Sequence, residues 1–389
     1  MRVLLITSPV STHLTPLVPL AWAIRAAGHE LLVAGRADVM AAAASAGLNA
    51  VELGGPLNVD ELLAKRLDPG RRPLESWGRP QLEQLSNIGR LWMPQTLEVL
   101  PRYLEVARRF RPDLIIGDPL EYLSLLLGEE LEVPVVHHRW GVDPVSGQAR
   151  AAGRDGLREA YERLGLTDLP FPDLLLDPCP PSLQLPGITP GAPVRFVPFN
   201  GNGVMPEWLR DSRGGTADRS RVAVSLGGRT IEYHGEGLFR HLVEAFGQMP
   251  EVEAVVTVRR RYHDVLGPIP ANVRLVEPLP LTLLLDSCSA VVHHGGAGTA
   301  MTASFFGLPQ LVLPQLADQF WYGERVTEAG AGLFLHDPAE QDDPARVRTA
   351  VRELLAEPRY AKAAAELRAE MAGMPSPARV VRDLEQLTR

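Results

Sequence analysis

The clearest chemical pattern in the sequence is the seven-residue run HHGGAGT at positions 293–299. It follows the apolar stretch AVV and precedes TAMTASFF, which predicts a strand, a turn and a helix. The first turn of a helix offers unpaired N–H groups and partial positive charge, and glycine lets a ligand approach the backbone. We therefore expect a phosphate-binding loop, formed by His294, Gly295, Gly296, Ala297, Gly298 and Thr299. A capped turn is the alternative.

This loop matches neither common nucleotide fingerprint, because no lysine follows the glycines and the G-x-G-x-x-G spacing is absent. A second glycine pair ends another predicted strand, in the segment SLGGRT at 225–230. There Gly227, Arg229 and Thr230 could add phosphate or sugar contacts. A plain turn would explain this segment equally well.

His13 lies in the predicted loop after the first strand, where parallel α/β folds place functional residues. It is a candidate general base, and a solvated loop histidine is the alternative. Asp118 ends another predicted strand, DLIIGD, in the same half of the chain. A carboxylate there could orient the imidazole and fix its tautomer.

Asp318 and Gln319 follow the predicted strand LPQLVLP. Together they offer acceptors and donors for sugar hydroxyls, although Asp is also a favoured helix N-cap. The two histidine pairs, at 137–138 and 293–294, predict no metal site, because adjacent strand residues point to opposite faces. We expect no cofactor.

The chain has 389 residues, enough for two domains, and a net charge of −8. The acidic balance argues against nucleic acid as the main partner. No apolar run approaches the ~18–20 residues that a membrane span needs. The first ten residues predict a strand rather than a signal peptide. Cys179 and Cys288 match no metal spacing, and both are expected to be small buried side chains in a reducing, cytoplasmic setting.

Strands and amphipathic helices alternate through both halves, which predicts two doubly wound α/β domains with parallel sheets facing one cleft. We place an N-terminal, acceptor-binding domain at 1–205, a linker at 206–220 and a C-terminal, nucleotide-sugar-binding domain at 221–376. The proline-rich stretch before the linker is expected to form loops. Hydrolases need a serine elbow of the G-x-S-x-G type, and the sequence contains none.

With HHGGAGT, PQLVLPQLADQ, STHLTPLVPLAWAIRAAGHE and PDLIIGD in place, the whole chain resembles the GT-B family 1 glycosyltransferases. Within that family it is similar to the actinobacterial enzymes that decorate polyketide antibiotics, including the urdamycin type. The resemblance implies a GT-B fold with two Rossmann-like domains. It also implies that the last helix, at about 377–389, packs back on the N-terminal domain.

The resemblance also implies roles for individual residues. His294 and the loop after it would bind the diphosphate of a thymidine diphosphate (TDP) sugar, with rhamnose the expected sugar. Asp318 and Gln319 would hold sugar hydroxyls, and the Leu279 backbone would pair with the base. His13 would be the base, with Asp118 as its partner. Residues of segments 55–95 and 137–150 could together bind a large apolar acceptor such as a macrolide or other polyketide aglycone, with core packing as the alternative for each one: Trp77, Trp92, Met93, Arg139 and Trp140.

The sequence departs from the family pattern at two positions. Pro278 stands where the family often has Trp or Phe, so base stacking needs another residue. Tyr322 stands where the family usually has Asn, which alters the expected contacts to the donor sugar.

The implied reaction is a metal-independent, inverting transfer with a histidine base. A nucleotide-sugar epimerase of the same fold and a non-catalytic helper protein that binds nucleotide sugar are the alternatives. An epimerase would not require a base after the first strand, so His13 argues against that alternative. A helper protein would be expected to have lost site residues, whereas His13, His294, Asp318 and Gln319 are all present. The oligomeric state is open, with a homodimer as one option.

Overall fold

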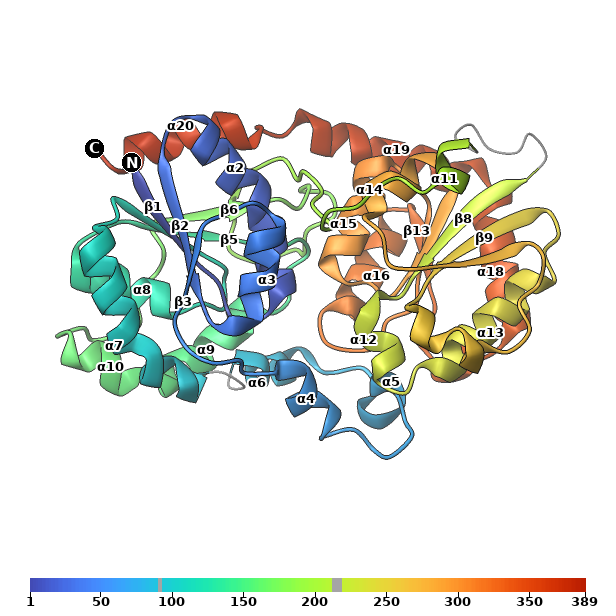
Figure 1. The fold of residues 1–389 in the computed structure, drawn as a ribbon, viewed down its shortest axis with the longest axis horizontal. Coiled ribbons are helices and arrows are strands. Elements are labelled where there is room, and N and C mark those ends of the chain that lie inside the picture. Colours follow the sequence, from blue (N-terminus) through green and yellow to red (C-terminus); the bar gives the residue numbers. More distant parts are fainter. Residues whose placement is uncertain (90–92, 212–218) are drawn as a thin grey trace.

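The computed structural model describes residues 1–89, 93–211 and 219–389. It contains a seven-stranded sheet from the N-terminal half and a six-stranded sheet from the C-terminal half. Helices cover both faces of each sheet (Figure 1). The two predicted α/β domains with parallel sheets are therefore confirmed.

The first sheet has the strand order β3-β2-β1-β4-β5-β6-β7, and every neighbouring pair is parallel. Its central strands β1, β4 and β5 are buried except for Arg2 at the start of β1, which explains the apolar runs VLLI in β1 and LII in β4. Its strands are β1 (Arg2–Ile6), β2 (Glu30–Gly35), β3 (Ala50–Glu52), β4 (Leu114–Gly117), β5 (Val135–His138), β6 (Leu174–Asp177) and β7 (Ala192–Pro193).

The second sheet repeats the same winding in the order β10-β9-β8-β11-β12-β13, again with every pair parallel. Its strands are β8 (Ser220–Ser225), β9 (Val252–Thr257), β10 (Val273–Val276), β11 (Ala290–His293), β12 (Gln310–Val312) and β13 (Gly332–Phe334).

Helices connect the strands in both halves. Those of the N-terminal half are α1 (Ser11–Leu14), α2 (Val18–Ala26), α3 (Ala37–Ser45), α4 (Val59–Ala64), α5 (Pro73–Trp77), α6 (Ser86–Gly89), α7 (Met93–Phe110), α8 (Leu123–Leu131), α9 (Ser146–Gly156) and α10 (Arg158–Arg163). Those that follow are α11 (Glu207–Asp211), α12 (Gly227–Glu232), α13 (Glu236–Gly247), α14 (Leu281–Leu284), α15 (Ala297–Phe306), α16 (Gln319–Glu328), α17 (Pro338–Gln341), α18 (Pro344–Ala356), α19 (Pro358–Gly373) and α20 (Pro377–Leu387).

Each sheet has one place where the strand order reverses direction, and ligands of open α/β folds bind there. In the first sheet this point lies between β1 and β4, which are followed by His13 and Asp118. In the second it lies between β8 and β11, which are followed by Arg229 and His294. The topology therefore places the main predicted site residues at the two switch points.

The stretch between the domains has more structure than its prolines and glycines predict. Strand β6 lies in the proline-rich region that we expected to form loops, and it pairs with β5. The segment expected to be a linker contains α11, whose Leu209 is fully buried with residues of the C-terminal half. The apolar spacing of these short elements is hidden by the prolines around them.

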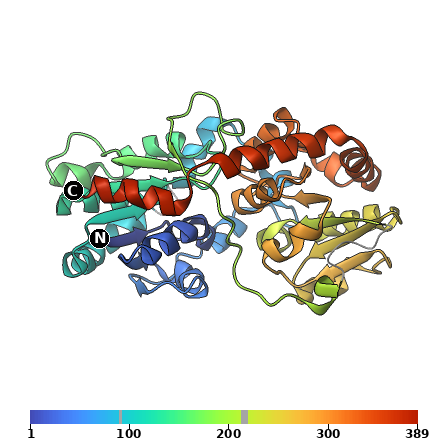
Figure 2. The same ribbon diagram turned by 90° about the horizontal axis from the view of Figure 1, so that it is seen from above.

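The last helix, α20, crosses to the N-terminal half and packs against α2 (Figures 1 and 2). Val380, Val381 and Leu384 are buried there in the core of the first sheet. A second bridge is the docking arm, which we define as residues 57–85. It lies beside the C-terminal half and joins it through Arg72–Asp342 and Arg79–Glu324 ion pairs.

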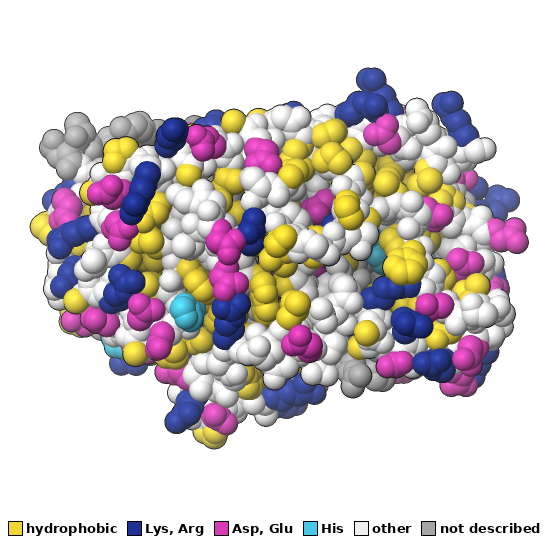
Figure 3. Space-filling view, turned by 180° about the vertical axis from the view of Figure 1, so that it is seen from behind, with side chains coloured by type: hydrophobic (Ala, Val, Ile, Leu, Met, Phe, Trp, Pro, Cys, Tyr) yellow, Lys and Arg dark blue, Asp and Glu magenta, His cyan; other side chains and the backbone are white. Residues whose placement is uncertain are grey.

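Charged side chains of both signs are interspersed on the face seen in Figure 3, rather than gathered into one basic stripe. This distribution agrees with the acidic net charge of −8. In the part of the chain that the structure describes, none of the helices has the length and apolarity needed to span a membrane.

Candidate active site

The candidate base, His13, lies on the short helix α1 and not in a loop as expected. Its Nδ1 lies 2.5 Å from the Oγ atom of Ser8, and this hydroxyl donates to Asp118 Oδ2 at 2.8 Å. The structure thus interposes Ser8 between the two residues that we predicted to be direct partners. The indole ring of Trp140 stacks on the His13 imidazole, with ring centroids 3.9 Å apart.

The surroundings of His13 keep its imidazole neutral. Burial lowers the pKa of His13 to about 3, and the positive charge of Arg229 acts in the same direction. A neutral imidazole has a free lone pair, which is the form that a general base requires.

Asp118 is fully buried at the end of β4. Burial raises the pKa of its carboxyl group to about 6, while hydrogen bonds from Ser8 and Leu120 oppose the shift. The backbone N–H groups of these two residues donate to it at 2.7 and 2.9 Å. The carboxylate is therefore held in one orientation.

In the predicted phosphate loop, the two adjacent histidines differ in burial and in their contacts. His293 is fully buried, and its ring accepts from Gly295 N–H at 3.0 Å and contacts the Gln310 side chain at 2.9 Å. Gly295 has a φ of +87°, and a Cβ there would lie 2.7 Å from the Gln319 carbonyl oxygen. His293 therefore supports the loop, whereas His294 is only half-buried.

The ring of His294 lies against two glycines of the two predicted phosphate segments. A Cβ at Gly296 would lie 2.4 Å from its Nε2 atom, and a Cβ at Gly227 would lie 3.0 Å from its Cε1 atom. Burial lowers the pKa of His294 to about 4. The helix α15 begins at Ala297, directly after Gly296, as the sequence predicts.

Arg229 connects the two switch points electrostatically. Its positive charge lowers the pKa of His13, which follows β1, and the pKa of His294, which follows β11. In this structure its Nε atom lies 2.8 Å from a carboxylate oxygen of Asp60 on the docking arm. Its neighbour Thr230 is buried and donates its hydroxyl proton to the Leu226 carbonyl, which commits that group to α12.

Asp318 and Gln319 begin α16, but Asp318 makes no capping hydrogen bond with its side chain. Burial raises the pKa of Asp318 to about 6. The preceding residue, Ala317, has a φ of +53°, a strained conformation of the kind that clusters at functional sites. The Gln319 amide oxygen accepts from the backbone N–H groups of Gln315 and Leu316, so its amide NH₂ group is the part that could serve a ligand.

Among the residues predicted to contact the base, Leu279 is partly buried against the core around α14, and Pro278 is exposed. Of the predicted acceptor contacts, Trp140 lies on His13, whereas Trp77 is 41% exposed on the docking arm. Trp92 lies outside the described residues, and the side chain of Met93 is likewise not described.

The predicted acceptor contact Arg139 is buried in a polar cluster of its own. Its Nε and Nη1 atoms each donate at 2.8 Å, to Asp143 and to Asp177, and Nη2 donates to the Thr189 carbonyl. All three nitrogens are engaged within the protein. This geometry favours a structural role over contact with an acceptor.

We therefore expect Arg139→Met to destabilise the fold by about 3–5 kcal/mol, because it leaves two buried carboxylates without their cation. Denaturant unfolding measures the change. Arg154→Met is the matched control, since the Arg154–Asp168 ion pair is exposed and screened by solvent. An Arg139→Met variant of normal stability with a raised KM for the acceptor would contradict the structural role.

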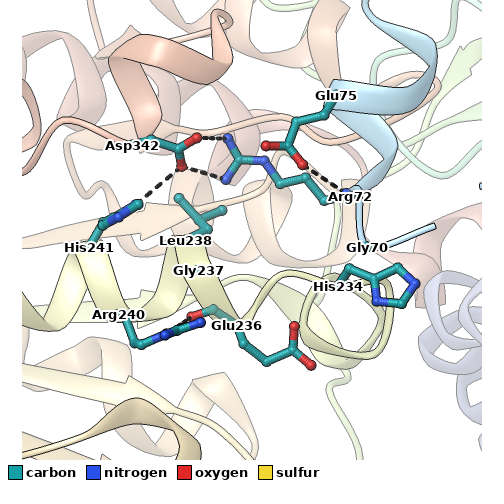
Figure 4. Close-up of a pocket in the computed structure, with 10 residues that line it drawn as sticks. All are labelled: Gly70, Arg72, Glu75, His234, Glu236, Gly237, Leu238, Arg240, His241 and Asp342. Atoms are coloured by element: carbon teal, nitrogen blue, oxygen red, sulfur yellow. Dashed lines mark hydrogen bonds and ion pairs between the residues drawn. The ribbon is translucent and has the colours of Figure 1, made fainter. Parts of the chain in front are cut away.

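A separate polar pocket of about 350 Å³ lies between the docking arm and α13. Figure 4 shows Arg72 reaching Asp342 across it, with His241 on the same carboxylate. Glu75 and Glu236 offset the arginines, and the lining residues include none of the predicted catalytic or donor-binding residues. The pocket therefore belongs to the contact between the two halves.

Among the described residues, no group of three or more His, Cys, Asp or Glu side chains is arranged to hold a metal ion. Histidines of the two pairs contact hydrogen-bonding groups of the protein instead. His137, for example, contacts Ser124 Oγ at 2.9 Å, and His138 contacts the Arg139 carbonyl.

Comparison with known proteins identifies the family. The profiles of the N- and C-terminal domains of erythromycin biosynthesis protein CIII-like proteins match residues 22–227 and 240–387. The chain belongs to the erythromycin biosynthesis CIII-like family. This is a family of antibiotic glycosyltransferases, so the predicted resemblance is confirmed.

Individual CIII-like relatives cover the whole chain. L-Demethylnoviosyl transferase of Streptomyces niveus is 35% identical, over 99% of this chain and 97% of the relative. Tylactone mycaminosyltransferase of Streptomyces fradiae is also 35% identical, over 100% and 92%. The structure of spinosyn rhamnosyltransferase with thymidine diphosphate has a TM-score of 0.86 at 38% identity, over 99% of this chain and 100% of that one. The fold is therefore GT-B.

Two residues of the candidate site were missed in the sequence analysis. Ser8 is a lone serine near the end of a strand, and a serine there carries no distinctive pattern. Asp60 lies 169 positions from Arg229, so only the docking of the arm brings the two together. Strand register could have suggested Ser8, because it follows β1 beside β4, which leads to Asp118.

Proposed function

We propose that this protein transfers a deoxysugar from a TDP-sugar to a hydroxyl group of a macrolide or other polyketide aglycone, with inversion and without a metal ion. The observation that carries the proposal is the placement of the site residues at the switch points of the two sheets, with His13 after β1 and the loop from His294 after β11. The docking arm joins the two halves beside this site, because Asp60 of the arm pairs with Arg229, which follows β8. A candidate base from one domain and a candidate diphosphate site from the other suit a single displacement.

His13 would take the proton of the acceptor hydroxyl as its oxygen attacks the anomeric carbon. The bond from that carbon to the diphosphate breaks, and its electron pair leaves with TDP. The growing negative charge would be stabilised by His294, Arg229 and the N–H groups at the start of α15. Attack opposite the leaving group inverts the anomeric centre, and the proton on His13 then passes to water.

The remaining predicted residues would bind the donor and acceptor. The backbone of the loop and the Thr299 hydroxyl would hold the diphosphate, while Asp318 and the Gln319 amide would hold sugar hydroxyls. The Leu279 backbone would contact the base. Trp140 would line the acceptor site beside His13, a position supported by their stacking.

Rhamnose is the proposed sugar because spinosyn rhamnosyltransferase is a structural neighbour at 38% identity, and its structure with spinosyn aglycone supports a macrolide acceptor. Curated relatives of 35% identity are named for other sugars, demethylnoviose and mycaminose, so the donor needs a direct test.

The test is transfer by the purified protein with a panel of TDP- and UDP-sugars, including TDP-rhamnose, and a macrolide aglycone. We expect glycoside formation from a TDP-deoxysugar at an unchanged rate with excess chelator. Loss of transfer on chelation would overturn metal independence. Nucleotide binding without transfer for every pair would favour a helper protein instead.

A further inference from the structure

A chain of three polar side chains connects the interior of the N-terminal domain with the candidate base. Asp118 accepts the Ser8 hydroxyl proton at 2.8 Å, and the same hydroxyl oxygen lies 2.5 Å from His13 Nδ1. Ser8 and Asp118 are both fully buried. The chain therefore has a fixed geometry.

The order of protons along this chain follows from the chemistry of its ends. An ionised carboxylate can only accept hydrogen bonds, and a serine hydroxyl has one proton to donate. When that proton points to Asp118, the Ser8 oxygen can only accept from His13. The imidazole must then carry its proton on Nδ1, so Nε2 is the unprotonated nitrogen.

We propose that Ser8 is a positioning residue that relays the charge of Asp118 to His13 and fixes the imidazole tautomer in which Nε2 is the base. This inference rests on the proposed function, because it assumes that His13 accepts the proton of the acceptor. It adds a residue that acts only through His13 and does not contact the reacting atoms.

Asp118 is ionised at neutral pH, and the groups around the relay are consistent with this state. Burial raises its pKa to about 6. Burial and the charge of Asp118 raise the pKa of Glu121 to about 8, so Glu121 is the protonated member of the two between these values. The positive charge of Arg229, which belongs to the other half of the chain, lowers the pKa of His13. The relay should therefore operate above about pH 6 and fail as Asp118 is protonated below it.

The most direct test is the ¹⁵N chemical shifts of the His13 imidazole in the unliganded protein, assigned with His13→Gln. We expect the Nδ1–H tautomer in the wild type and a mixture of tautomers in Ser8→Ala. This readout does not need substrate, so it tests the relay even if the proposed transfer fails. The Nε2–H tautomer in the wild type would overturn the relay.

Kinetics provide the second readout, with the donor and aglycone pair that the panel identifies. Ser8→Ala should lower kcat at neutral pH by at least about tenfold, and by no more than the 10²–10⁴-fold that the general base itself contributes. The fall in kcat/KM that we expect below about pH 6 in the wild type should be absent in Ser8→Ala. Ser8→Thr, which keeps the hydroxyl, should restore most of the rate.

Two further variants distinguish loss of the relay from a nonspecific effect of removing a buried polar side chain. Ser124→Ala removes another buried serine that contacts a histidine, His137, and should leave the pH profile unchanged. Asp118→Asn should lose as much activity as Ser8→Ala, and the double variant should lose no more than either. Additive losses, or wild-type kcat and pH profile in a folded Ser8→Ala variant, would overturn the proposal.

Discussion

His13→Ala is expected to lower kcat by about 10²–10⁴-fold, the range for loss of a general base. The affinity for TDP should stay unchanged, because His13 follows β1 of the first sheet and the predicted diphosphate site follows β8 and β11 of the second. An acceptor alcohol is too weakly acidic to ionise at neutral pH, so the rate depends on removing its proton as the new bond forms. Steady-state kinetics and TDP titration by calorimetry measure the two quantities.

Thr12→Ala is the matched control, since Thr12 is an exposed neighbour of His13 on α1. It should retain the wild-type kcat. If His13→Ala transfers sugar at the wild-type rate, the base has been assigned to the wrong residue.

The second large effect is expected at the donor site. His294→Ala should lower kcat/KM by about 10²–10³-fold, the range for loss of one group that stabilises developing negative charge. It should also weaken TDP binding, because the neutral imidazole can donate to a phosphate oxygen. The TDP affinity is measured directly by titration, independently of turnover.

A neighbouring glycine provides an independent route to the same result. Gly296→Ala keeps His294 but places a Cβ 2.4 Å from its Nε2 atom, so the ring must move. We expect a similar loss of TDP affinity. Gly237→Ala on α13 is the control, because a Cβ there meets no atom within 4 Å. Wild-type TDP affinity in both His294→Ala and Gly296→Ala would contradict the donor-site assignment.

The sequence predicted the fold where local signals were strong. The apolar strands β1, β4, β8 and β11 and the glycine run before α15 were all correctly placed. A proline also separates two helices near the C-terminus, since α18 ends at Ala356 and α19 begins at Pro358. Proline cannot donate the helical hydrogen bond, so its effect is local and visible in sequence.

Prediction from the sequence failed where the structure depends on contacts between residues that are far apart in the chain. Strand β6 is held by pairing with β5, which outweighs the prolines around it. Arg139 has the appearance of a ligand-binding residue in sequence, but Asp177 lies 38 positions away and only the fold pairs them. Ser8 acquires its position in the same way, through a hydrogen bond to a residue 110 positions distant.

The central claim is a single displacement at the anomeric carbon with His13 as the base. The measurement that tests it most directly is the anomeric configuration of the glycoside formed by the wild type, read by NMR from the one-bond carbon–proton coupling. We expect the glycoside to have the opposite anomeric configuration to that of the TDP-sugar donor. A product with retained configuration would contradict it, because retention requires two displacements or attack from the leaving-group side.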